Sequence, residues 1–136
     1  MSLVGDVLTQ LEVELRAAVP TLPAGTAGVE RGWRPSHELQ PGSLPHVFLY
    51  NVTESRDALM FLQARVRVQL SGIIVRQGST YAQALEDYEA LSDLIEANPT
   101  LTNVVEQSEL ALEGVEADAG GVRRGLAFTF AGWTVL

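Results

Sequence analysis

STYAQALEDYEALSDLIEANP, residues Ser79 to Pro99, is the clearest helical stretch of this chain, and the segments on both sides of it alternate as strands do. Its large apolar residues recur at steps of three and four, which places them on one side of a helix. They are Tyr81, Leu85, Tyr88, Leu91 and Ile95. Thr80 with Gln83 predicts an N-terminal capping box, and Asn98 followed by proline predicts the end of the helix.

The other side of this predicted helix is uniformly acidic. It carries Glu86, Asp87, Glu89, Asp93 and Glu96. No basic residue lies within the stretch, so no ion pair between residues four apart stabilises it. We therefore expect one face of the helix to pack on the core and the other to be available to a partner.

The length and composition indicate a single folded domain, residues 1–136. The chain has 136 residues, of which 46% are hydrophobic and 19% charged, values typical of globular domains. A net charge of −8 disfavours a general nucleic-acid-binding surface, which needs basic side chains. The chain lacks cysteine, a basic and apolar leader, and an apolar run of membrane-spanning length, so we expect assembly in the cytoplasm and no membrane contact.

A second helix is predicted from Ser2 to Val19. Its apolar stripe consists of Val4, Leu8, Leu11 and Leu15. Acidic and basic residues occupy the remaining positions, as in an amphipathic helix packed on a core. Pro20 predicts its end, because proline cannot continue the backbone hydrogen-bond pattern.

The stretch from Pro20 to Pro45 has no regular periodicity and contains five of the six prolines. Such a long loop in a compact domain is typically functional or ordered by a partner. Within it, Trp33 stands between Arg31 and Arg34. Either the indole folds back onto the core, or the three residues form an exposed group that docks on a neighbouring subunit, since Trp and Arg are enriched at interface hot spots.

The strongest strand pattern follows this loop. His46–Tyr50 predicts a short strand, and the polar Asn51–Ala58 segment predicts a turn. From Leu62 onward apolar and polar residues alternate, as in a strand with one face on a core. The apolar set is Leu62, Ala64, Val66, Val68 and Leu70, and the polar set is Gln63, Arg65, Arg67, Gln69 and Ser71. Gly72 predicts a bend or bulge before the strand continues to Val75.

Two further strands are expected after the acidic helix, at Asn103–Ala117 and Val122–Leu136, joined by a Gly-rich turn at Asp118–Gly121. The order of elements predicts an α+β fold. In this fold an antiparallel sheet of four to five strands packs on one central helix plus an N-terminal helix.

No motif for catalysis, cofactor binding or metal binding is present, so we expect no enzyme. The two histidines, His37 and His46, have no metal-ligand spacing. The glycine pair at 120–121 precedes Arg123 and Arg124, which resembles an anion-binding loop, but a hairpin turn accounts for it more simply.

Arg65 and Arg67 lie on the same face of the predicted strand, about 7 Å apart. One interpretation gives them cross-strand partners such as Glu109 or Glu113 on a solvated sheet. The other places them against the acidic helix face of a second copy. Contact between two unlike surfaces joins subunits head to tail, and it forms a ring when the rotation closes.

The pattern resembles the tail terminator, or tail completion, proteins of tailed bacteriophages and the related cap proteins of contractile injection systems. The resemblance covers the opening helix, the Pro/Gly-rich loop, LPHVFLYNVTESRD, the acidic helix and the closing FTFAGWTVL. It implies a homohexameric ring that caps the tail tube, ends its polymerisation, and provides a docking surface for a neck, connector or sheath protein. It also implies a location in the virion, no catalysis or cofactor, and DNA that crosses the lumen without specific binding.

We expect the subunit and tube interfaces to include two groups of residues. They are Arg31, Trp33, Arg34, Arg65 and Arg67, and the acidic residues Glu86, Glu89, Asp93 and Glu96. Two alternatives remain. The first is another neck or head–tail connector component, and the second is a small-ligand-binding α+β domain with a pocket between sheet and central helix.

Overall fold

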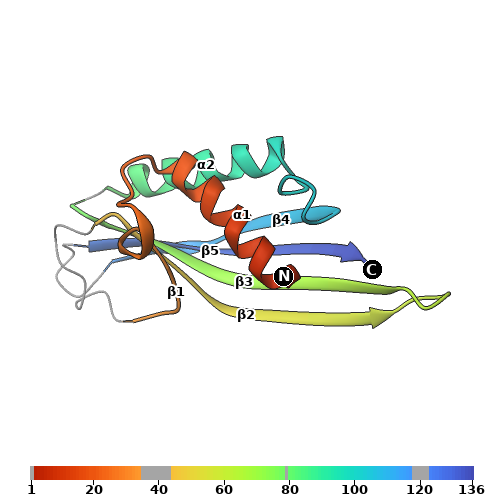
Figure 1. Cartoon of the computed structure of the whole chain (residues 1–136). Coiled ribbons are helices and arrows are strands. Elements are labelled where there is room, and N and C mark those ends of the chain that lie inside the picture. Colours follow the sequence, from red (N-terminus) through yellow and green to blue (C-terminus); the bar gives the residue numbers. More distant parts are fainter. Residues whose placement is uncertain (1, 35–43, 79, 118–122) are drawn as a thin grey trace.

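The computed structural model describes residues 2–34, 44–78, 80–117 and 123–136. One sheet of five strands carries both α-helices on the same face (Figure 1), which confirms the α+β fold. The helices are α1 (Leu3–Ala18) and α2 (Tyr81–Ala97), with a short 3-10 turn, η1 (Gly25–Ala27). The strands are β1 (Val29–Arg31), β2 (His46–Ala58), β3 (Ala64–Gln77), β4 (Gln107–Ala117) and β5 (Arg123–Val135).

The sheet has the strand order β1-β2-β3-β5-β4. The four long strands are antiparallel to their neighbours, as predicted, but β1 runs parallel to β2, so the sheet is mixed. β1 lies in the stretch that was predicted to be an irregular loop. It has only three residues, too few to show a period of two, and glycines flank it on both sides.

The ends of both helices follow their capping residues. The Ser2 hydroxyl accepts a hydrogen bond from the Gly5 amide, and the Thr80 hydroxyl accepts one from the Gln83 amide. Asn98 is the C-cap of α2. Both helices therefore begin and end within two residues of the predicted positions.

The buried stripes of the two helices meet the inner face of the sheet. On the helix side the buried residues are Val7, Leu8, Leu11, Leu15, Ala84, Leu91 and Ile95. Val68, Leu70, Phe128 and Phe130 complete the core from the sheet. The buried face of α2 is rotated from the prediction, because Tyr81 is 56% exposed and Asp87 is buried in its place.

Asp87 corrects the predicted acidic face of α2. Both its carboxylate oxygens accept hydrogen bonds from Arg76 of β3, at 2.6 and 3.0 Å. Two parallel bonds of this kind fix the orientation of both side chains. Asp87 therefore anchors α2 to the sheet, and it is not available to a partner.

The segment Asn51–Ala58 also differs from its predicted turn, because it is the second half of β2. The register of β2 against β3 shifts between Tyr50 and Thr53, where Asn51 has a φ of 52°. Every residue of this segment is exposed, so its sequence has no apolar alternation by which a strand could be recognised. Residues 103–106, predicted to begin a strand, precede β4 instead.

Gly72 has a different role from the predicted bend. β3 is continuous through it, with Gly72 opposite Leu49 on one side and Phe128 on the other. A Cβ atom at this position would overlap the Phe128 ring. Only glycine leaves room for that ring over the middle of the sheet.

We predict that Gly72→Ala lowers the free energy of unfolding by about 1–3 kcal/mol, because the added methyl forces the Phe128 ring out of its place. Gly114→Ala is the matched control, since a Cβ atom at Gly114 would meet nothing within 4 Å. It should change stability by no more than about 0.5 kcal/mol. Urea unfolding measures both variants. Equal stability of the two variants would contradict this role of Gly72.

Candidate subunit interface

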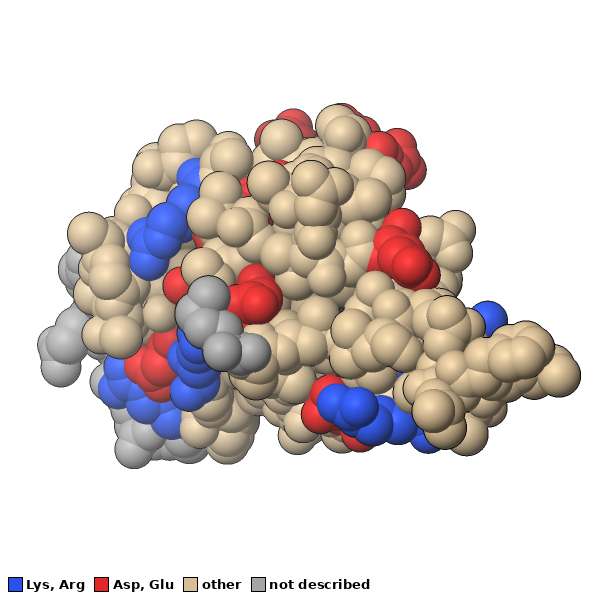
Figure 2. Space-filling view, turned by 45° about the vertical axis from the view of Figure 1, so that its right-hand side comes forward, with Lys and Arg blue, Asp and Glu red and all other residues tan. Residues whose placement is uncertain are grey.

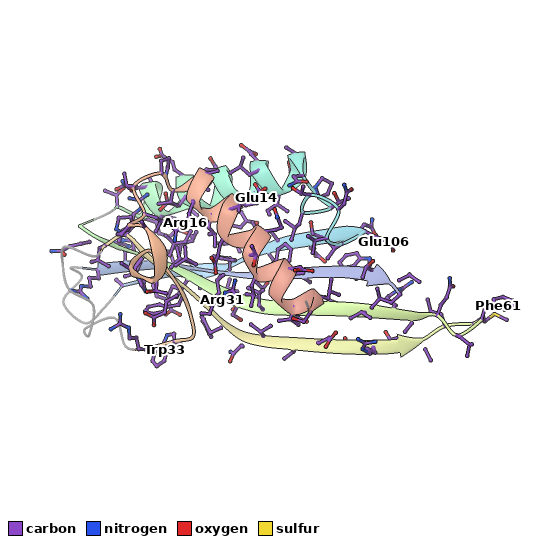
Figure 3. The ribbon with its side chains drawn as sticks, in the orientation of Figure 1. Glu14, Arg16, Arg31, Trp33, Phe61 and Glu106 are labelled. Atoms are coloured by element: carbon purple, nitrogen blue, oxygen red, sulfur yellow. The ribbon has the colours of Figure 1, made fainter. Side chains whose placement is uncertain are left out.

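The β2–β3 hairpin projects beyond the helices and ends in an apolar tip (Figures 1 and 3). Leu59, Met60, Phe61 and Leu62 are 39%, 76%, 88% and 104% exposed. Phe61 and Leu62 also have positive φ angles of 61° and 62°, a conformation that costs energy for residues with bulky side chains. Packing within this chain therefore gives no reason for four apolar side chains at the tip.

The sequence interpretation missed this tip and placed Leu62 among the core positions of the following strand. The signal was present, because four consecutive apolar residues without Gly, Pro, Asn or Asp join two exposed polar segments. An apolar run in a turn is out of place unless it has a function.

The sheet face opposite the helices is the uncovered face, since no described helix packs on it (Figure 1). Arg65 and Arg67 both lie there and are exposed, alternating with the buried Val66 and Val68, as predicted. The Arg67 guanidinium lies 5.9 Å from the centre of the Trp133 ring. At this distance the cation is attracted to the face of the aromatic ring, which is a cation–π interaction.

The predicted cross-strand partners of these arginines lie farther away than expected. β5 separates β3 from β4, so neither Glu109 nor Glu113 is directly opposite an arginine. Glu109 and Asp57 line a shallow hollow of about 410 Å³ with Arg65, Arg67 and Trp133, and Asp57 is the residue opposite Arg65 on β2. Among the described residues neither arginine forms an ion pair.

The outer face of α2 and the adjoining edge strand β4 form a second surface, the acidic flank. Its members are Glu86, Glu89, Asp93 and Glu96 of α2, Glu106 just before β4, and Glu109, Glu113 and Glu116 of β4, all exposed. Glu109 also lines the hollow beside Arg65 and Arg67. Neither α2 nor β4 contains a basic residue. Figure 2 shows acidic atoms at the top of the molecule, and basic atoms with acidic atoms beside them at the root of the projecting hairpin.

Trp33 lies between Arg31 and Arg34, and each of these two arginines pairs with a glutamate of its own chain. Arg31 donates to Glu12 of α1 at 2.8 Å, and Arg34 lies 3.2 Å from Glu30. Trp33 is 60% exposed, so its indole is not packed on the core (Figure 3). The residues that follow, 35–43, lie outside the described part of the chain, and His37 is among them.

The described residues contain no group of three or more His, Asp or Glu side chains that could hold a metal ion. His46 is buried at the start of β2, and its Nδ1–H donates to the carbonyl oxygen of Ala27 at 2.7 Å. Its Nε2 lies 3.6 Å from a Glu30 oxygen. The third group beside this pair is the Arg34 guanidinium, which lies 3.2 Å from the same Glu30 oxygen. The glycine pair at 120–121 lies outside the described residues.

No hollow found among the described residues has the features of an enclosed ligand site. The space between α2 and the sheet is filled by Leu91, Phe128 and Phe130, all at most 1% exposed. A hollow of about 570 Å³ lies along α1. Its one basic side chain, Arg31, already pairs with Glu12 of α1.

Tyr50 reports on the electrostatics of the uncovered face. Burial raises the pKa of the Tyr50 hydroxyl above its ordinary value of 10.0, and the carboxylates of Glu113 and then Glu116 raise it further. The negative charge of β4 thus extends to β2, across the intervening strands.

No family model matches the sequence, and the search of curated proteins also found no match. No helix among the described residues is long and apolar enough to cross a membrane.

We predict that Tyr50 makes the protein less stable at high pH. Because the pKa of Tyr50 is higher in the folded chain than in the unfolded chain, its contribution is complete below the ordinary pKa of 10.0 and is lost as the pH rises through the folded value. Urea unfolding of the wild type and Tyr50→Phe across this range measures it. The variant should lose less stability at alkaline pH, and an unchanged loss would contradict the assignment.

Proposed function

We propose that this chain is a structural ring protein that caps a tail tube, ends the polymerisation of the tube, and offers a docking surface to a neck, connector or sheath protein. The ring is a homohexamer in the virion. The proposal rests on the resemblance to tail terminator and injection-system cap proteins, together with the surfaces described above. A neck or head–tail connector component is the alternative in the same class.

The observation that carries the proposal is a pair of unlike groups of exposed side chains, Arg65 and Arg67 on β3 and the carboxylates on the outer face of α2. The uncovered face presents Arg65 and Arg67 without an ion-pair partner among the described residues. The acidic flank presents eight carboxylates without a basic neighbour on its own elements. One surface of each subunit is therefore complementary to the other surface of the next, and repeated contact of this kind makes a ring.

The acidic balance of the chain suits a ring that DNA crosses. With a net charge of −8, the protein has no surplus of cations to displace the counterions of DNA. DNA passing through such a lumen would be repelled weakly and would slide without specific binding.

Trp33 and the hairpin tip are the exposed apolar groups that a larger assembly would use. Both are more than half exposed in the single chain. Exposed aromatic and aliphatic anchors of this kind supply most of the binding energy at protein interfaces. In the proposed particle they would contact neighbouring subunits or the last ring of the tube.

We predict that Arg65→Glu with Arg67→Glu weakens self-association at least tenfold, because like charges then face each other across the subunit contact. Both side chains are exposed, so the free energy of unfolding should change by no more than about 0.5 kcal/mol per substitution. Sedimentation measures the association, and electron microscopy shows whether rings form.

The charge-preserving pair Arg65→Lys and Arg67→Lys is the control, and it should still assemble. Unchanged ring formation in the Glu pair would contradict the contact. A wild-type chain that stays monomeric, and that fails to bind the end of a tail tube, would contradict the proposed function itself.

A further inference from the structure

We propose that the hairpin tip, Leu59–Leu62, inserts into the groove between α2 and β4 of the next copy of this chain. The inference rests on the proposed ring and specifies its contact. Each copy has one tip and one groove on different elements, so the contact is heterologous and every tip in a closed ring is occupied.

The groove lies at the open edge of the sheet, where α2 does not fully cover β4. It has a volume of about 370 Å³. Ile95, Pro99 and Leu110 supply its apolar lining, and Ser92, Ser108 and Glu96 supply polar groups. Leu112 follows Leu110 on the same face of β4 and is 41% exposed, so the apolar strip continues along the edge.

Met60 and Phe61 of the tip would contact the apolar part of the groove, which is Ile95, Pro99 and Leu110. The volume of the groove is at the lower end of the ~300–1,000 Å³ typical of small-ligand pockets. This volume can hold a few side chains such as Met60 and Phe61. Arg56 and Arg65 lie behind the tip on the two strands of the hairpin, and Arg56 is only weakly engaged, 3.5 Å from Glu54. When the tip is inserted, these guanidinium groups face carboxylates of the acidic flank.

Charge selects a second copy over a lipid surface as the occupant. A chain of net charge −8 without lysine is repelled by anionic lipids. The arginines at the root of the tip find complementary charge on the acidic flank of this same protein. The tip extends along the direction of the strands beyond the rest of the described chain (Figure 3), and Met60, Phe61 and Leu62 are mostly exposed.

A cysteine pair tests this contact directly, since the natural chain has no cysteine. Phe61→Cys combined with Ser92→Cys, a small residue lining the groove, should give a ladder of disulfide-linked oligomers on mild oxidation. Phe61→Cys combined with Val13→Cys is the control, because Val13 is 54% exposed on α1, outside the groove. This control should give no ladder.

Substitution of the tip gives a second readout that does not depend on oxidation. Met60→Asp with Phe61→Asp removes two apolar side chains that are 76% and 88% exposed in the single chain, so folding should be unaffected. Self-association should weaken about a hundredfold. Val13→Asp is the control, because it places the same charge at another exposed apolar residue. It should leave self-association unchanged.

The outcomes separate this inference from the proposed function. The tip-in-groove contact would be overturned if the Phe61→Cys, Ser92→Cys chain formed rings without disulfide-linked oligomers, or if the Met60→Asp, Phe61→Asp chain still formed rings. Either result would leave the proposed ring itself standing. A wild-type chain that is monomeric at every concentration would overturn both. The ladder together with the loss of association in the tip variant supports the contact.

Discussion

Apolar and polar residues alternate along β3, and this alternation determines which side chains enter the core and which stay on the surface. Its residues Val66, Val68 and Leu70 enter the core, and Arg65 and Arg67 between them point to the opposite face. Because β3 pairs with β2 and β5 along most of its length, a slip of one residue would exchange the two sets and expose the core. The register that buries the valines is therefore the same register that presents the arginines.

The helices complete one side of this sheet and leave the other side open. α1 and α2 pack on the face that carries Phe128 and Phe130, so the arginine face, the β4 edge and the end of the hairpin stay exposed. The exposed surfaces differ in character, one basic and apolar at its tip, the other acidic with an apolar groove. Such differences favour head-to-tail association of identical chains over symmetric pairing.

The long helices and strands could be predicted from the sequence, because burial of one face requires apolar residues to recur at the spacing of a helix or a strand. Both helices, β3 and β5 follow from apolar spacing alone. Asp87 was misassigned because a buried carboxylate is indistinguishable from an exposed one until Arg76 is known to face it. The second half of β2 was missed because both its faces are exposed, and the tip because its apolar residues continued the pattern of β3. The surfaces proposed here to mediate assembly were thus those for which burial within one chain gives no signal.

Head-to-tail association through unlike surfaces is tested most directly by mixing two charge-reversed variants. One carries Arg65→Glu and Arg67→Glu, and the other carries Glu89→Arg and Glu96→Arg. Each alone should fail to assemble, because like charges meet at every contact, whereas the mixture restores opposite charges at all of them. Native mass spectrometry of the mixture should show a closed ring with equal numbers of both variants. Assembly of either variant alone, or a mixture that remains monomeric, would contradict association through these surfaces.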